Sequence, residues 1–183
     1  MVFRTQELKD ELEQIIQENK SIVKELQKES IEHLNQRPAP KSWSALACIE
    51  HINRYDAYYL PKIDEKLDQA ASSEVDYFRA GLFGYRFANF LHPDKHQIKT
   101  KTFPSMNPGS SDLDPSILDT FLTHQSKLSD QLERSRSVDL NKIKIRSSVT
   151  ALLQFKLGDL FRVLVFHDLR HVRQAAHALS RIQ

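Results

Sequence analysis

Two histidines, His167 and His171, stand four residues apart in the segment FHDLRHVRQ. On a helix, this spacing places the two side chains one above the other, about 40° apart around the axis. Each neutral imidazole has a donor and an acceptor nitrogen to satisfy, and a divalent cation can bind one nitrogen of each ring, as in zinc sites. Hydrogen bonds to backbone or aspartate groups are the alternative. The pair by itself does not choose between the two.

The surroundings of the pair indicate that both rings point into the protein. We expect the last helix to run from about Leu152 or Lys156 to Arg181. Three apolar residues lie within about 60° of His167 on its helical wheel: Leu160, Leu164 and Ala178. The opposite side carries polar residues, which predicts a surface that faces solvent: Arg162, Arg170, Arg173 and His177.

A third ligand for a metal ion has to come from another helix. His51 is the first candidate, because it lies on the edge of the apolar face of the predicted second helix. His124 has a similar place on the predicted third helix and is the reserve. Three histidines from two helices would leave coordination positions open for water or substrate, as in catalytic sites. The weaker candidates are His33, at the end of the first helix, and the pair His92 and His96. Pro93 disfavours a regular helix through this pair, and we expect both of its histidines to be exposed.

Long amphipathic helices must position these histidines. Apolar residues recur at three- and four-residue steps along residues 3–35, and Pro38 and Pro40 end this helix. The second helix begins after Ser44 as its N-cap, and Pro61 predicts a kink or an interruption in it.

A third helix opens at Asp114, with Pro115 at its first helical position, and reaches Arg134. Ile143 and Ile145 alternate with charged residues in a short extended segment. Strand signals are otherwise almost absent. The sequence therefore predicts an all-α protein, a four-helix bundle with a long crossover connection.

The helical pattern is lost between Ala71 and Ser111. This segment carries three prolines and seven aromatic residues: Tyr77, Phe78, Phe83, Tyr85, Phe87, Phe90 and Phe103. We expect a long aromatic-rich crossover loop. It would act as a lid or pocket wall, or it would only plug one end of the bundle, and the sequence does not separate these roles.

The composition is that of an ordinary globular protein, for which we expect one domain over residues 1–183. The net charge of +2 gives no reason to expect nucleic-acid binding. Cys48, the single cysteine, cannot form an internal disulfide and is more typical of a small core residue than of a nucleophile. The polar start MVFRTQELKDELEQ and the lack of a long apolar run predict a cytoplasmic protein that does not enter a membrane.

Two segments, SWSALACIEHINRYDAYYLPKI and FHDLRHVRQAAHAL, together resemble the DinB-like superfamily of metal-dependent four-helix bundles. The segment KTFPSMNPGSSDLD also resembles the residues that precede the third helix in that family. The resemblance runs from about Pro38 to the end of the sequence. The family pattern of one histidine on the second helix, a pair on the last helix and a following glutamine falls on His51, His167, His171 and Gln174.

The resemblance implies that His51, His167 and His171 bind a divalent metal ion, with zinc or nickel the first candidates. Gln174 would touch a metal-bound water or line the pocket, and an ordinary interhelical hydrogen bond is its competing role. Related proteins include thiol S-transferases and isomerases that use bacillithiol, mycothiol or glutathione, and others described as metal-dependent hydrolases. We therefore expect a small-molecule substrate and consider a low-molecular-weight thiol as a cofactor.

Other roles stay open at this point. Asp56 and Asp168 are candidates to hold the metal ligands in place or to carry protons. The alternative to an enzyme is a non-catalytic helical bundle that binds a ligand in its cavity or dimerises through its helices. A homodimer is the candidate assembly.

Overall fold

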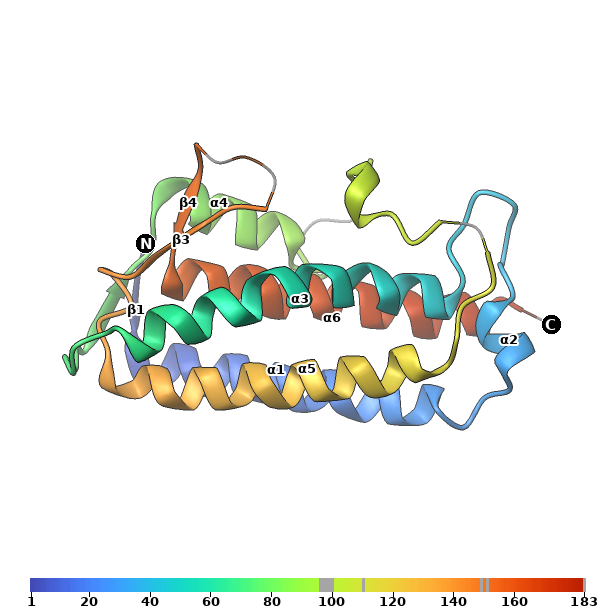
Figure 1. Ribbon diagram of the computed structural model, residues 1–183, viewed down its shortest axis with the longest axis horizontal. Helices are drawn as coiled ribbons and strands as arrows, with labels where there is room; N and C mark the ends of the chain where they lie inside the picture. The colour runs from blue at the N-terminus through green and yellow to red at the C-terminus, as the bar shows by residue number, and fades with distance from the viewer. Residues whose placement is uncertain (96–100, 110, 149, 151, 183) are drawn as a thin grey trace.

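In the computed structural model, four long helices lie side by side and form a bundle (Figure 1). The structure describes the whole chain except residues 96–100, 110, 149, 151 and 183. In chain order the elements are β1 (Val2–Arg4), α1 (Thr5–Leu26), α2 (Ile31–Asn35), α3 (Ala45–Asp68), β2 (Tyr77–Arg79), α4 (Leu82–Leu91), the 3₁₀-helix η1 (Pro104–Met106), α5 (Ser116–Arg134), the 3₁₀-helix η2 (Ser135–Ser137), β3 (Lys144–Arg146), β4 (Gln154–Lys156) and α6 (Leu157–Ser180). The predicted all-α bundle is confirmed. Among the described residues, no helix is long and apolar enough to span a bilayer.

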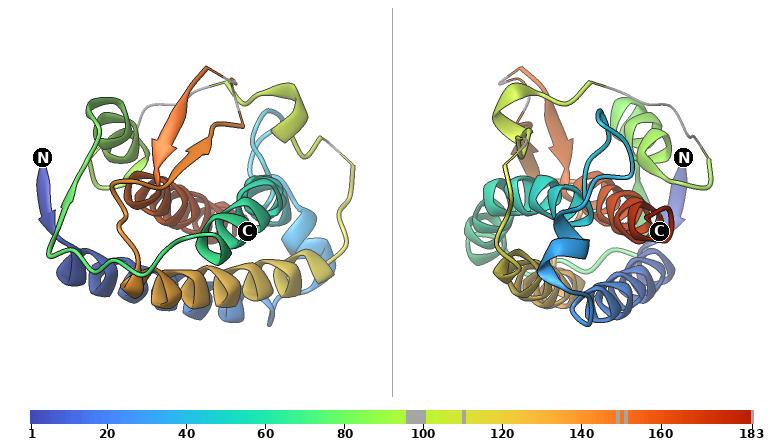
Figure 2. Two further views of the ribbon diagram at one scale, coloured as in Figure 1. Left: turned by 60° about the vertical axis from the view of Figure 1, so that its left-hand side comes forward. Right: turned by 90° about the vertical axis from the view of Figure 1, so that its right-hand side faces the viewer.

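The four long helices form a ring in which α1 and α3 each contact both α5 and α6 (Figure 2). Lys9 in α1 donates a 2.8 Å hydrogen bond to the Ser135 carbonyl at the end of α5, and Gln27 just beyond α1 donates at 2.7 Å to Asp119 near the start of α5. Helices α1 and α5 are therefore antiparallel. Helices α3 and α5 are parallel (Figure 1), which requires the predicted crossover between them.

Three helix boundaries differ from the sequence predictions or refine them. The single helix expected over residues 3–35 is wrong, because the chain turns after α1 and Ser30 caps a new helix by accepting a hydrogen bond from the His33 amide. Helix α3 continues through Pro61 without an interruption. Pro61 and Ala57, four residues earlier, are both exposed, so water can satisfy the carbonyl that proline leaves without a donor. The last helix begins after Lys156, the later of its two predicted starts.

The crossover is more ordered than the predicted loop over residues 71–111. It contains β2, α4 and η1, and β2 pairs in an antiparallel manner with β1. Helix α4 was not predicted, because its sequence, LFGYRFANFL, consists mostly of apolar residues. The helix also begins after Gly81, which has no side chain to cap it. The short extended segment around Ile145 is confirmed as β3, which pairs with β4.

Helix α4 covers the outer side of α6. Asp159 in α6 accepts a 2.8 Å hydrogen bond from the Gly81 amide. Arg162, which we expected to face solvent, is only 2 % exposed, and its guanidinium lies over the rings of Phe3 and Tyr85 at 4.7 and 5.3 Å. The expectation for Arg162 is wrong because the helix that buries it was not foreseen.

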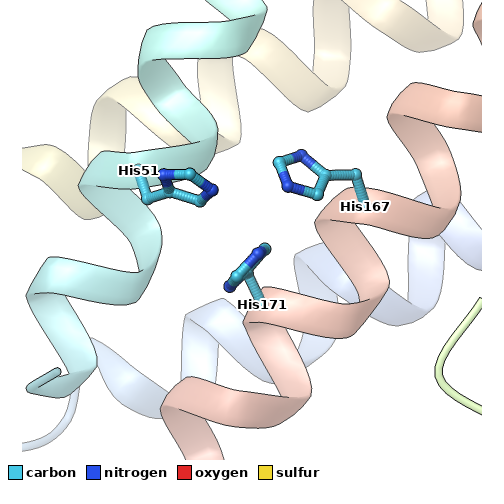
Figure 3. A group of neighbouring side chains, drawn as sticks. All are labelled: His51, His167 and His171. Atoms are coloured by element: carbon cyan, nitrogen blue, oxygen red, sulfur yellow. The ribbon is translucent and has the colours of Figure 1, made fainter. Parts of the chain in front are cut away.

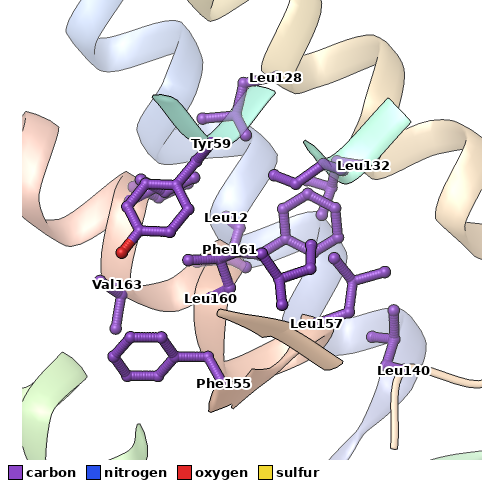
Figure 4. Packing of buried hydrophobic residues seen from close by; sticks show 14 of the residues in the cluster. Leu12, Tyr59, Leu128, Leu132, Leu140, Phe155, Leu157, Leu160, Phe161 and Val163 are labelled. Atoms are coloured by element: carbon purple, nitrogen blue, oxygen red, sulfur yellow. The ribbon is translucent and has the colours of Figure 1, made fainter. Parts of the chain in front are cut away.

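Two hydrophobic clusters fill the bundle. One includes Leu12, Tyr59, Leu128 and Phe161 (Figure 4), and the other contains residues such as Val23, Ile49, Phe121 and Val172. Between them, each long helix contributes a polar residue with no exposed surface: Asn19, Asp56, Gln125 and Asp168. We call these four residues the polar layer.

We predict that Gly84→Ala destabilises the protein, although alanine favours helices over glycine by about 1 kcal/mol. A Cβ at position 84 would lie 2.4 Å from Cγ of the buried Asp159, so α4 and α6 would have to move apart. The expected loss is about 1–3 kcal/mol of unfolding free energy, measured by urea denaturation. Arg86→Ala, on the exposed side of α4, is the control. A Gly84→Ala protein as stable as the wild type would contradict this packing.

Candidate metal centre

The three histidines chosen from the sequence meet between α3 and α6 (Figure 3). His51 projects from α3, and His167 and His171 project from successive turns of α6 toward it. The ring centroids are 4.6 to 5.1 Å apart in all three pairs. One ring nitrogen from each residue lies within 4.8 Å of the other two, so the group could hold a metal ion. The inward orientation predicted for the pair on α6 is confirmed.

A backbone carbonyl fixes the ring of His51. Ser44 caps α3 by accepting a hydrogen bond from the Ala47 amide, as predicted, and this sets the start of the helix that carries His51. The Nδ1 atom of His51 lies 2.8 Å from the Met106 carbonyl oxygen. Because a carbonyl only accepts, Nδ1 must carry the proton and donate, which leaves Nε2 with a free lone pair. His51 is therefore in the tautomer that a metal ligand needs.

Aromatic rings and burial keep the three imidazoles neutral. The rings of Trp43 and Tyr55 lie 4.8 and 5.2 Å from that of His51. Burial lowers the pKa of His51 and lowers the pKa values of His167 and His171 well below that of free histidine. The charges of neighbouring groups, including Arg170, lower the pKa values of His167 and His171 further. Neutral imidazoles are the form that binds metal, so protons do not compete for this site near pH 7.

The donor set fits a divalent transition-metal ion. His171 Nδ1 is buried and makes no hydrogen bond to any described residue, an unsatisfied nitrogen in a site lined by imidazoles. Nitrogens bound to one ion at about 2.1 Å lie about 3.4 Å apart in a tetrahedral site. The most separated nitrogens would therefore need to approach each other by roughly 1.4 Å from the 4.8 Å limit seen here. Rotations of the imidazole side chains supply such a movement.

The remaining histidines lie away from this group. His124, the reserve ligand, has Nδ1 3.8 Å from Asp56 Oδ2. His92 is half-buried against Phe166, with ring centroids 4.6 Å apart, so the expectation that it is exposed is wrong. His33, on the separate helix α2, pairs at 2.7 Å with Glu29, which precedes that helix, and His177 is exposed as predicted. His96 lies outside the described residues.

Gln174 and Cys48 have different surroundings. The Gln174 side chain is exposed one turn beyond His171, and it raises the pKa of His171, against the larger effect of burial. Cys48 is a buried core residue, as predicted, and burial raises its thiol pKa to about 12.

The two aspartates belong to the polar layer. Both oxygens of Asp56 lack a hydrogen-bond partner among the described residues, and Asp168 accepts a 2.8 Å hydrogen bond from Gln125 Nε2. Burial raises the pKa of Asp168 to about 7, and burial together with the charge of Asp168 raises the pKa of Asp56 well above its ordinary value. Neither carboxyl group orients a histidine through a hydrogen bond, so that part of the expectation is wrong. The Met106 carbonyl takes this role for His51.

Sequence reasoning missed the residues that enclose the site. In the sequence Trp43 is only the residue before the Ser44 cap, yet its ring also lies 5.8 Å from that of His171. The partner of His51 is a backbone atom 55 residues away. No side-chain pattern in the sequence signals a carbonyl group, although the family-like segment around Met106 marks the region.

The protein is a helical bundle with a crossover between α3 and α5, which are parallel. Three histidines meet between α3 and α6, so it belongs to the class of helical bundles that have a candidate metal centre between two helices. The sequence matches the DinB superfamily over residues 11–175. The protein therefore belongs to this superfamily, and the match includes most of the first long helix. No curated protein and no solved structure matches the chain significantly.

We predict that Asp56→Asn stabilises the metal-free protein at pH 8 by about 1–3 kcal/mol, the cost of a buried carboxyl oxygen without a partner. A carboxyl group whose folded pKa is raised is neutral in the fold at low pH, and its stabilisation is lost as the pH rises above about 4. The gain should therefore be larger at pH 8 than at pH 5 in urea titrations. The exposed Asp112→Asn is the control. An equal effect of Asp56→Asn at both pH values would contradict the burial of a titrating carboxyl group.

Proposed function

We propose that His51, His167 and His171 bind one divalent metal ion and that the protein is a metal-dependent enzyme acting on a small molecule. The convergence of three neutral imidazoles from two helices carries this proposal. Three protein ligands leave coordination positions for a substrate, whereas structural sites use four. An all-imidazole set suits zinc and nickel, and also iron and copper.

The described residues divide the work of such a site between them. The three imidazoles hold the ion, and the Met106 carbonyl keeps His51 in the binding tautomer. Trp43 and Tyr55 keep water from the rings. When bound, a divalent ion with neutral ligands keeps its double charge and lowers the pKa of a thiol or water molecule that joins it.

The buried position of two carboxyl groups near the site favours thiol transfer over hydrolysis as the reaction. A metal-dependent hydrolase commonly uses a carboxylate as general base, but Asp56 and Asp168 lie in the polar layer. A thiol needs only to lose its proton to become a nucleophile. Cys48 cannot supply it, since it is buried with a pKa of about 12. We propose that the thiol is a separate low-molecular-weight molecule. Its proton passes to water, and its sulfur forms a C–S bond with an electrophilic carbon of the substrate as the bond from that carbon to a leaving group breaks.

The alternative is a non-catalytic bundle that binds ligands or dimerises. A metal ion that lies at the junction of α3 and α6 should stabilise the fold on binding. Loss of metal from the purified protein with no change in melting temperature would favour the alternative.

We predict that His51→Ala, His167→Ala and His171→Ala each abolish metal retention and leave the helical content largely intact. Elemental analysis and far-ultraviolet circular dichroism of purified, untagged proteins provide the measurement. The wild type should carry about one divalent ion per chain. Each variant should lose it, because each imidazole supplies a substantial part of the binding energy. His124→Ala, one helix away, should retain the ion. A ligand variant with a full complement of metal would remove that residue from the site.

We predict that the cobalt(II)-substituted protein binds low-molecular-weight thiols directly. When glutathione or cysteine is titrated, thiolate coordination should add a charge-transfer band in the near-ultraviolet region of the absorption spectrum, because soft thiolates readily coordinate cobalt(II). Serine, which replaces the thiol of cysteine by a hydroxyl, should leave the spectrum unchanged. Equal responses to cysteine and serine, or none, would argue against the transferase and leave hydrolysis of esters or amides as the activity to assay.

A further inference from the structure

Residues 103–109, which we call the strap, pass over the metal centre beside α3. The strap contains η1, and only Pro108 within it is buried. Phe103 at its start is 49 % exposed. A segment with so little buried apolar surface depends on its hydrogen bonds for a fixed position.

His51 depends on the strap for its orientation. The Met106 carbonyl that accepts from His51 Nδ1 at 2.8 Å belongs to this segment. A backbone carbonyl has no side chain of its own to hold it, so the groups that bind the strap determine where it lies. A shift of the strap would release Nδ1 and let the ring change its tautomer or rotate.

Arg54 holds the strap next to that carbonyl. It lies three residues after His51 on α3, and its Nη1 donates a 2.7 Å hydrogen bond to the Asn107 carbonyl. Glu50 orients the guanidinium by accepting from Nε at 2.7 Å. Consecutive carbonyls of the strap are thus bound by His51 and Arg54, which lie on one turn of the same helix.

We infer that Arg54 is a positioning residue of the metal centre, one that presents His51 Nε2 to the ion by fixing the Met106 carbonyl. The inference rests on the proposed role of His51 as a ligand. Arg54 has a second, opposite effect, since its positive charge lowers the pKa of His51 and repels a cation. Electrostatics alone therefore predicts that loss of Arg54 strengthens metal binding, whereas positioning predicts that it weakens binding.

The first measurement is the zinc affinity of the purified protein in competition with a chromophoric chelator. Arg54→Met should weaken binding by about 10- to 100-fold, the usual effect of losing a group that orients a ligand. Arg54→Lys keeps the charge and one donor and should recover part of this loss. Arg37→Met is the matched control, because Arg37 binds the far end of the strap at the Gly109 carbonyl, 3.1 Å away.

The second measurement is ¹⁵N nuclear magnetic resonance of the histidine rings in the metal-free proteins. Wild-type His51 should be the Nδ1–H tautomer, Arg54→Met should lose this preference, and Arg54→Lys should restore it in part. Unchanged or tighter zinc binding by Arg54→Met would overturn the inference, as would a loss of affinity with the His51 tautomer unchanged. An equal loss in Arg37→Met would also overturn it. Absence of zinc binding in the wild type would defeat the proposed function, while the tautomer measurement would still decide whether Arg54 positions His51.

Discussion

Removing three imidazoles from water is the constraint on which the site depends. A histidine kept from solvent loses the hydration of its charged form, which is why burial is the largest influence on the pKa values of His51, His167 and His171. The same burial makes an unsatisfied nitrogen costly. The fold meets part of this cost through the Met106 carbonyl. One ring nitrogen of each histidine lies within 4.8 Å of the other two, an arrangement that a bound ion would stabilise.

The polar layer imposes a second cost on the bundle. Asn19, Asp56, Gln125 and Asp168 interrupt a hydrophobic interior, and most of their polar atoms find no partner among the described residues. Apolar residues at these positions would pack at lower cost. Polar groups at one level of all four helices do, however, oppose any sliding of one helix along another, because a shift would place them in the hydrophobic clusters on either side. The layer therefore favours one register of the helices beside the three histidines.

Sequence periodicity was sufficient for the long helices and for the inward pair His167 and His171, because both follow from side chains at regular helical spacing. The choice of His51 over His124 as the third member rested on the family resemblance. The inward orientation of His167 could be read from the leucines one and two turns before it. The predictions that failed, or that could not be made, concern features that depend on tertiary contacts. The burial of Arg162 depends on α4, a short helix rich in aromatic residues that begins after Gly81 without a side-chain cap. The support of His51 depends on a carbonyl, which every residue carries and which no sequence pattern distinguishes.

The separation of the histidines along the chain has a consequence for folding. His51 and His167 are 116 residues apart, and the crossover and α5 lie between them. The two residues meet only when α3 and α6 pack together, so the centre belongs to the long-range contacts of this topology, which form slowly. A covalent link that closes a loop of this size restricts an unfolded chain by about 4–5 kcal/mol. Three histidines joined through one ion would act in the same direction, as a reversible cross-link between distant parts of the chain.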